Sequence, residues 1–349
     1  MSEPAPAPYV VDIGDVARDR GKVLGLWRGN LGEDVRMQSK FDWFYAKCPF
    51  GEPTLCLLRH VADGSHVGVA SAGPRKMLVG GSAMEAGVLV DLAVGAEHRS
   101  LGPAMMLQAA IAEHGAARFS LLYGFPNPKA APVFKRVGYS KLGEIVRHAR
   151  VLRHADYLAR RMPRALATMG GWLVDIGVRL RDGWRARSDP RLLVLWSDAA
   201  DPRFDSLWAR SAPDSMALSI RDYAFARWRF DQCPFEKTQF LLLSDPANGD
   251  LQAWFACQVK DNTLHVRDFW SAEAATGVSR THVDALLAEA RKQGHAALSI
   301  EIAGRSDRLE GWRAAGFSAR GKRPVFGKWS DGRNVDDVDL YLTSADEDE

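Results

Sequence analysis

A repeat within the chain constrains its fold more than any other feature of the sequence. Both copies carry a tryptophan followed at fixed spacing by Cys-Pro-Phe: Trp43, Cys48, Pro49 and Phe50 in the first, and Trp228, Cys233, Pro234 and Phe235 in the second. Strand-like runs follow each motif, at 54–59 and 66–72 and again at 239–243 and 252–259. The 349 residues suffice for two such units, each with its own core. We therefore expect two copies of one α/β unit.

The correspondence continues through the later elements of each copy. A β-branched apolar run at 88–94 matches 264–270, and each run contains one acid, Asp91 in the first and Asp268 in the second. The apolar-periodic helix at 104–116 then matches residues 279–293. These pairs predict the same succession of strands and helices in both halves.

The loop at 95–104 of the first copy has the features of an anion-binding site. It leads from a strand into a helix, so unpaired N–H groups and the positive end of the helix dipole point outward. Gly102 and Ala104 are small enough for a pyrophosphate to approach the backbone, and Arg99 adds a permanent cation. The loop predicts a site for phosphate groups.

A second motif follows the next predicted strand, at 119–125. Its residues are Asn127, Ala130, Phe134, Gly138 and Tyr139. With this motif and the preceding loop, the chain resembles the GNAT acyltransferase superfamily. That family carries Arg/Gln-x-x-Gly-x-Gly/Ala on the loop and Asn-x-x-Ala-x-x-x-Tyr-x-x-x-Gly-Phe downstream. The resemblance to tandem GNAT proteins covers nearly all of the chain, with specific motifs in the first half only.

The resemblance implies an acyl-coenzyme A, acetyl-CoA or another, as co-substrate of a coenzyme A-dependent N-acyltransferase, most simply an N-acetyltransferase. Transfer to the amine acceptor would be direct. The implied donor-binding residues are Leu92, Ala93, Val94, Arg99, Ser100, Leu101, Gly102, Ala104 and Asn127. A non-catalytic acyl-CoA sensor or scaffold is the alternative. No metal is expected.

The implied fold class is α/β, with two GNAT-like domains, each a central mixed, largely antiparallel sheet flanked by helices. The expected domains are an acyl-CoA-binding domain at 9–150, a basic amphipathic helical linker at 151–190 and a degenerate copy at 191–330. The second copy lacks the loop motif and carries Glu273 nearby, which would repel phosphate. Residues 331–349 are expected to form a C-terminal tail whose acidic end, 344–349, is loose.

Asp91 is the candidate general base, because burial in an apolar strand would raise its pKa towards useful basicity. Its counterpart Asp268 favours a structural role shared by both copies, and that alternative stays open. Glu97 and His98 also lie close to the loop. Phe134 cannot donate a proton where the family often has a tyrosine general acid.

The linker at 155–187 combines apolar residues at helical spacing with basic surroundings. Between residues 147 and 191 the chain has eleven arginines against four aspartates. Such a helix could lie on an anionic membrane surface, or pack between the two domains. Pro103, in the predicted phosphate loop, has no N–H and removes one donor there.

Composition and cysteine spacing exclude some functions and indicate a compartment. A net charge of +3 with no recognised nucleic-acid motif argues against nucleic-acid binding. The four cysteines are far apart and indicate neither a zinc site nor a disulfide framework, so we expect a cytoplasmic protein, with peripheral contact at the inner membrane face if the linker binds lipid. The acceptor, a small-molecule or lipid-linked amine such as an amino sugar or an envelope or polysaccharide intermediate, stays open. So does the oligomeric state.

Overall fold

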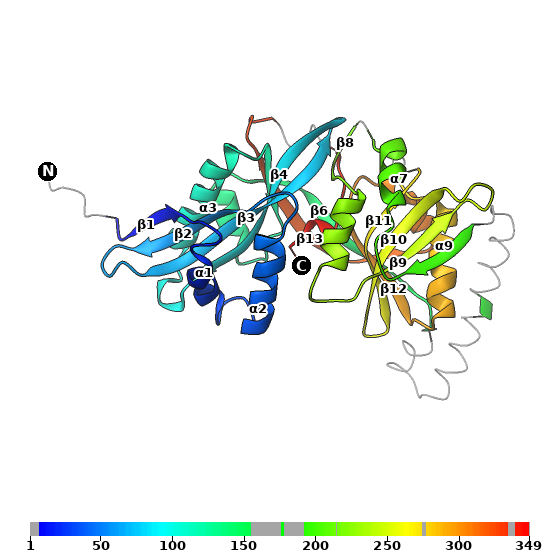
Figure 1. The fold of residues 1–349 in the computed structure, drawn as a ribbon, viewed down its shortest axis with the longest axis horizontal. Coiled ribbons are helices and arrows are strands. Elements are labelled where there is room, and N and C mark those ends of the chain that lie inside the picture. The colour runs from blue at the N-terminus through cyan, green and yellow to red at the C-terminus, as the bar shows by residue number, and fades with distance from the viewer. Residues whose placement is uncertain are drawn as a thin grey trace.

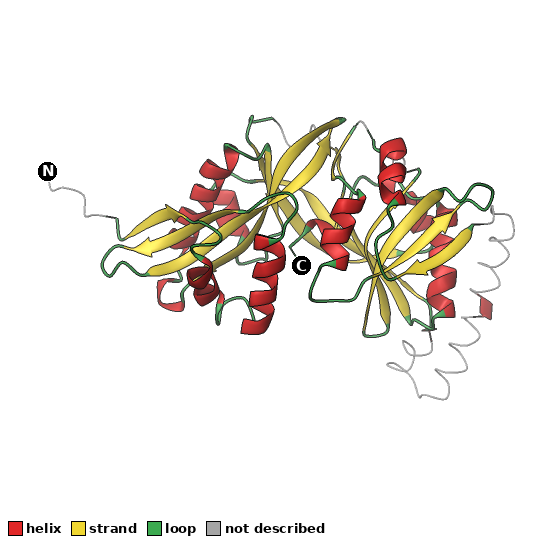
Figure 2. Ribbon diagram, in the orientation of Figure 1, coloured by secondary structure: helices red, strands yellow, loops and turns green. Residues whose placement is uncertain are grey.

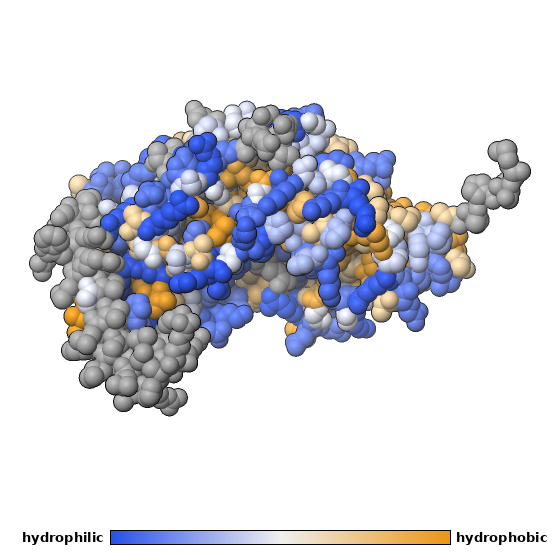
Figure 3. Space-filling view, turned by 180° about the vertical axis from the view of Figure 1, so that it is seen from behind, coloured by the Kyte–Doolittle hydropathy of each residue, from blue (hydrophilic) through white to orange (hydrophobic). Residues whose placement is uncertain are grey.

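The computed structural model describes residues 7–154, 176–177, 192–213, 215–273, 277–333 and 339–348. Apart from residues 176–177, the predicted amphipathic linker helix at 155–187 lies outside these ranges, so its membrane or packing role stays a prediction. None of the helices in the described ranges combines the length and apolar character needed to cross a bilayer. Viewed from behind, polar residues cover much of the surface that is coloured, and apolar groups are scattered among them (Figure 3).

The first half builds a sheet with helices packed against it (Figure 1). Its elements are β1 (Tyr9–Ile13), α1 (Arg20–Trp27), α2 (Asp34–Lys40), the π-helical turn η1 (Phe41–Ala46), β2 (Thr54–His60), β3 (His66–Val79), β4 (Ser82–Val94), α3 (Leu101–Ala116), β5 (Leu121–Gly124), α4 (Ala131–Arg136) and β6 (Ser140–Val151).

The second half repeats most of this order. Its elements are β7 (Leu193–Ser197), α7 (Arg203–Ser211), β8 (Met216–Ser219), α8 (Tyr223–Ala226), the π-helical turn η3 (Arg227–Asp231), β9 (Gln239–Ser244), β10 (Leu251–Lys260), β11 (Thr263–Ser271), α9 (Arg280–Lys292), β12 (Ala297–Ala303), α10 (Glu310–Ala314), β13 (Ser318–Trp329), β14 (Asp339–Leu340), β15 (Leu342–Thr343) and the short 3-10 helix η7 (Ser344–Asp346).

The predicted fold class is confirmed. Three strands, a helix, a strand, a short helix and a final strand follow one another from β2 to β6 and again from β9 to β13. Most neighbouring strands are antiparallel, but β4 runs parallel to β5 and β11 runs parallel to β12. The result is a mixed, largely antiparallel sheet with helices at its faces (Figure 2).

The two halves share a single sheet because they exchange their last strands. The strand order is β1-β2-β3-β4-β5-β13-β6-β12-β11-β10-β9-β7. Strand β13, from the end of the second half, pairs with β5, and β6, from the end of the first half, pairs with β12. A division of the chain at residues 150 and 191 therefore separates its two repeats without separating two sheets.

The repeated tryptophans pack on each other at the centre of the molecule. The rings of Trp43 and Trp228 stack with their centroids 5.3 Å apart. The indole N–H of Trp43 donates to the carbonyl of Trp228 at 2.8 Å, and the indole of Trp228 donates back to the carbonyl of Trp43 at 3.4 Å. The repeated motif thus serves the packing of one half against the other.

The acidic C-terminal end is buried, so the prediction of a loose tail at 344–349 is wrong for the residues described. The segment enters the middle of the molecule (Figure 1), where Asp346 is fully buried and its carboxylate accepts a hydrogen bond from Arg221 at 3.1 Å. Glu347 accepts from Arg323, and its backbone carbonyl accepts from Arg75 at 3.0 Å. Arginines from both halves hold this segment: Arg221 and Arg323 bind its carboxylates, and Arg75 binds its backbone.

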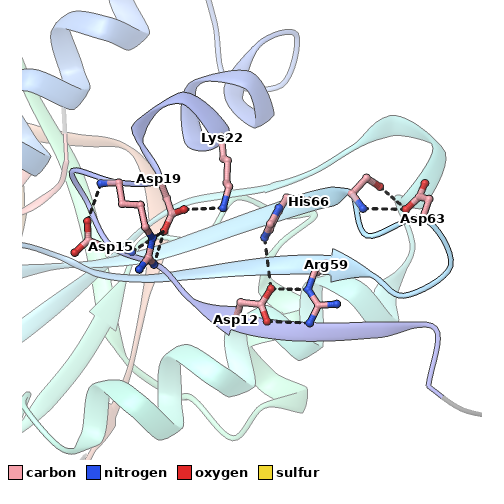
Figure 4. Close-up of polar contacts among 9 residues, drawn as sticks. Asp12, Asp15, Asp19, Lys22, Arg59, Asp63 and His66 are labelled. Atoms are coloured by element: carbon pink, nitrogen blue, oxygen red, sulfur yellow. Dashed lines mark hydrogen bonds and ion pairs between the residues drawn. The ribbon is translucent and has the colours of Figure 1, made fainter.

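The outer end of the first half is fastened by polar contacts between strands (Figure 4). Asp12 of β1 accepts from the guanidinium of Arg59 on β2 at 2.8 Å, and His66 of β3 lies 3.4 Å from the same carboxylate. Asp19, which precedes α1, accepts from Lys22 at 2.7 Å. The first two contacts join β1 to β2 and β3, and the third is local to the start of α1.

Candidate functional site

Strands β4 and β5 separate in the middle of the first half. Their parallel pairing runs from Ala86 opposite Leu121 to Val88 opposite Tyr123 and stops there. Beyond this point β4 also bulges against β3, because the register shifts where Asp91 and Leu92 should pair. Since a bulge bends its strand and interrupts the ladder, it contributes to the gap between β4 and β5.

The gap between β4 and β5 opens into a cavity of about 300 Å³. Another cavity, of about 370 Å³, lies elsewhere in the molecule. Among the residues predicted for the site, Asp91, Leu92 and Asn127 line the smaller cavity. Helix α2 contributes Lys40 to its wall, and the C-terminal segment contributes Asp348. The strand gap thus gathers residues from four parts of the chain.

Asp91 lies at the bulge in a conformation that is uncommon for residues other than glycine. Its φ of 54° is in the left-handed region, which aspartate tolerates better than most side chains. Its carboxylate accepts hydrogen bonds from the ammonium of Lys40 and from the hydroxyl of Tyr45, both at 2.7 Å. Such backbone strain is often found at functional sites.

The charge balance around Asp91 favours proton uptake. Burial raises the pKa of Asp91, and the nearby Asp348 carboxylate raises it further, while the Lys40 ammonium opposes both. Burial also acts to raise the pKa of Asp348, but Lys40, which donates to it at 2.6 Å, outweighs burial and lowers that pKa. A single ammonium therefore bridges two carboxylates, of which Asp91 has the more basic character.

Sequence reasoning did not identify Lys40, Tyr45 or Asp348. The signal for the first two was a difference between the repeats: aligned on their tryptophans, the second copy has Phe225 in place of Lys40 and Phe230 in place of Tyr45. Polar groups at two such positions in one copy only would have pointed to a site there. No local pattern marked Asp348.

The N-terminus of α3 is uncapped. Ser100 is the N-cap residue, and in the described structure its side chain makes no capping hydrogen bond. Leu101 and Gly102 are exposed in the first turn, and Pro103 is buried and has no N–H. Backbone donors of the first turn at 101 and 102 therefore face solvent at the positive end of a helix of 16 residues.

The corresponding helix α9 has a different start. The hydroxyl of Ser279 caps it by accepting from the backbone N–H of His282 at 3.3 Å. Glu273 places a carboxylate 3.3 Å from the ring of the same histidine. Within the described residues, the two equivalent helix starts therefore differ: α9 has a side-chain cap with Glu273 close to it, whereas α3 has no side-chain cap.

Among the remaining loop residues, Arg99 and His98 hold the loop through hydrogen bonds. Arg99 is exposed, and its guanidinium donates to the carbonyl of Val94 at 3.1 Å and to the side-chain oxygen of Asn30. His98 shares a hydrogen bond with Tyr9 at 2.9 Å, and Glu97 is exposed. Neither Glu97 nor His98 lines the cavity.

Asn127 and Phe134 have structural contacts as well as a place in the cavity wall. The side-chain oxygen of Asn127 accepts from the backbone N–H groups of Lys129 and Ala130, both at 3.0 Å, and so shapes the turn into α4. Phe134 is buried, and its ring packs against Tyr139 at a centroid distance of 5.2 Å. Phe134 therefore belongs to the core of the first half as well as to the cavity wall.

The equivalent gap in the second half is filled by the chain itself. Pairing of β11 with β12 stops at Val266 opposite Ile300, and β15 then pairs with β12 on that side. The hydroxyl of Thr343 donates to Asp268 at 2.8 Å, and Arg221 donates to it at 2.9 Å. The two equivalent aspartates thus have different surroundings: Asp91 faces a cavity, and Asp268 is fully buried among partners.

Comparison with solved structures identifies the fold. A protein from Enterococcus faecalis V583 described as a probable N-acyltransferase superposes with a TM-score of 0.62 at 10% identity, over 93% of this chain and 73% of its own. GCN5-related N-acetyltransferases from Kribbella flavida and Anabaena variabilis ATCC 29413 give TM-scores of 0.61 and 0.60 at 13% and 10% identity. They match over 92% of this chain and over 71% and 73% of their own. No family model and no curated protein matches the sequence. The chain has the fold of the GCN5-related N-acetyltransferases.

Proposed function

We propose that the protein is a coenzyme A-dependent N-acyltransferase that binds its acyl donor, acetyl-CoA or another acyl-CoA, in the first half only. The observation that carries this proposal is the asymmetry of the two strand gaps. The gap beside β4 opens into a cavity next to the uncapped α3, whereas the gap beside β11 is occupied by β15. The fold shared with N-acetyltransferases supports the choice of reaction.

The proposed donor position follows the exposed groups of the first half. The pyrophosphate would lie at the start of α3, where Leu101 and Gly102 offer backbone donors and Arg99 lies beside the loop. The acyl arm would then extend to the edge of β4, where the backbone at 92–94 is no longer paired with β5. A backbone N–H at this edge would polarise the thioester carbonyl as the oxyanion forms.

The proposed transfer step makes one bond, breaks one bond and moves one proton. The amine nitrogen attacks the thioester carbonyl carbon, a C–N bond forms, and the C–S bond breaks. Asp91, as a carboxylate, takes the proton that the attacking amine loses. The coenzyme A thiolate leaves as the anion, because Phe134 has no proton to donate. Lys40 and Tyr45 position the Asp91 carboxylate through their hydrogen bonds.

A thiol-release assay tests the proposed activity. Acetyl-CoA is mixed with the full chain and a panel of amines that includes amino sugars, amino acids and lipid-linked amino sugars, and free thiol is followed with a thiol reagent. We expect release that depends on both the chain and an amine. Saturable acetyl-CoA binding without release for any amine would instead support the alternative of a non-catalytic acyl-CoA sensor, which the phenylalanine at 134 favours.

Gly102→Asp is expected to abolish acetyl-CoA binding without harming the fold. A Cβ at this position meets no atom within 4 Å, and an acid in the first turn of a helix is favourable to the helix dipole. The same carboxylate would repel a pyrophosphate. Isothermal titration and a thermal melt measure the two effects. Gly102→Ala is the matched control and should retain binding; tight binding by Gly102→Asp would show that the phosphates lie elsewhere.

A further inference from the structure

A cavity of about 370 Å³ lies where the two halves meet and has no part in the donor site. Helix α2 of the first half contributes Arg36 to it, and strand β6 contributes Arg147. The second half contributes η3, β11 and β12, and Ser344 comes from the C-terminal segment. Arg36 also closes one side, since its guanidinium lies over the ring of Phe235 at 4.1 Å.

The lining of this cavity is strongly cationic. Its five permanent cations are Arg36, Arg147, Arg229, Lys260 and Arg267. Its two carboxylates are Glu236 and Glu301, and Glu301 already accepts a hydrogen bond from Arg323 at 2.6 Å. His265 adds no charge of its own near neutral pH, because burial and then the neighbouring Arg267 lower its pKa. The excess of positive charge would raise the local concentration of an anion.

Arg229 is the buried member of this group. It is 3% exposed, and its Nε donates to the carbonyl of Ala345 at 2.9 Å. Its Nη2 has no hydrogen-bond partner within the described part of the chain. Burial, and then the nearby Arg267, lower the pKa of Arg229 to about 10. A buried guanidinium is costly without a full set of acceptors, and Arg229 lines the cavity, so an anion there would lie beside this buried cation.

We propose that this cavity binds an anionic group, a carboxylate or a phosphate, carried by the acyl acceptor. The inference rests on the proposed function for the identity of its occupant. Two elements line both this cavity and the donor cavity. Helix α2 contributes Arg36 to this cavity and Lys40 to the donor cavity. The C-terminal segment contributes Ser344 to this cavity and Asp348 to the donor cavity. An acceptor anchored here by its anion is thus held beside the elements that carry the donor site.

Anion binding is tested without any need for turnover. Inorganic phosphate and, separately, acetate are titrated into the full chain and followed by calorimetry or by ³¹P and ¹H NMR. We expect saturable binding of at least one of them. Because Arg147→Ala removes one charge-assisted hydrogen bond, it should weaken that binding by about tenfold or more. Arg320→Ala, which removes an exposed arginine outside the cavity, is the control and should change nothing.

A second pair of variants tests the buried cation. Arg229→Gln removes this cation and should abolish anion binding. If Arg229→Gln does not fold, anion binding is measured with Arg267→Ala instead. The absence of saturable binding to the unaltered chain, or an equal loss in Arg147→Ala and Arg320→Ala, would overturn the inference. Saturable phosphate binding in a chain that never releases thiol would instead overturn the proposed activity and leave the anion site in place.

Matched amines then identify the source of the anion. Glucosamine 6-phosphate is compared with glucosamine, and glycine with glycinamide, in the thiol-release assay. In Arg147→Ala the KM of the charged member of the preferred pair should rise by about tenfold, while kcat and the KM of its neutral partner stay unchanged. Equal effects on both members of each pair would show that the anion does not belong to the acceptor. A preference for the phosphate pair or the glycine pair identifies the anion.

Discussion

Turnover by the Asp91→Asn variant is expected to fall about 10²-fold or more while the variant still folds. Asparagine keeps the shape of the side chain and removes the group that accepts the amine proton. Lys40 and Tyr45 donate to different oxygens of the carboxylate, so the single amide oxygen of asparagine can keep one of these two hydrogen bonds. The amide NH2 can instead donate to the Tyr45 hydroxyl, but an amide cannot pair with the Lys40 charge as a carboxylate does. Steady-state thiol release, with circular dichroism to confirm the fold, measures the effect.

The pH dependence distinguishes a base from a structural residue. Burial raises the pKa of Asp91, so the unaltered enzyme should lose activity as pH falls through a value above the ordinary range for aspartate. A base acts only when deprotonated, so this acidic limb should disappear in Asp91→Asn. Asp268→Asn, the matched change in the second half, should leave kcat unchanged and lower stability. If the rates of Asp91→Asn are unchanged between about pH 6 and pH 9, the general base is not Asp91, and Glu97, His98 or water takes the proton.

Loss of Arg221 is expected to produce the largest change in stability. Its guanidinium donates to Asp268 at 2.9 Å and to Asp346 at 3.1 Å, and all three side chains are fully buried. Arg221→Met would leave two buried carboxylates without their cation, so the free energy of unfolding should fall by about 3–5 kcal/mol at neutral pH. Urea denaturation measures the change, provided the variant remains folded in the absence of urea.

The sign of the pH effect adds a second check on Arg221. Burial raises the pKa of Asp268, and removing its arginine would raise that pKa further. The carboxylate takes up a proton as pH falls, so the deficit of Arg221→Met should shrink in acid. Arg333→Ala removes the exposed partner of Asp331 and should cost at most about 1 kcal/mol. An Arg221→Met deficit no larger than that of the control would contradict the structural role.

The features that sequence predicted correctly are those that local patterns specify. The strand and helix periodicity and the repeated motif predicted the α/β succession of both halves, and the apolar run around Asp91 predicted an acid with a buried side chain in β4. The turn into α3 was predicted from residues near one another along the chain, Arg99 and Gly102, and phosphate binding at this turn stays a prediction. These features depend on short separations, and a single sequence contains them.

The features that escaped prediction depend on contacts between distant parts of the chain. The sequence of β13 reads as the last strand of the second unit, and nothing in it specifies pairing with β5 of the first. Asp348 contacts Lys40 across 308 positions, and a short acidic end is usually solvated. Only the folded arrangement of arginines and Lys40 makes burial of that end favourable.

Isothermal titration of acetyl-CoA into the full chain counts the donor sites. We expect one saturable site per chain, because β15 fills the gap beside β11. The open gap beside β4, lined by Asp91 and Leu92, is the single place left for the donor among the described parts of the two repeats. Two sites per chain would show that the second half also binds the donor, and no binding at all would contradict the proposed acyltransferase.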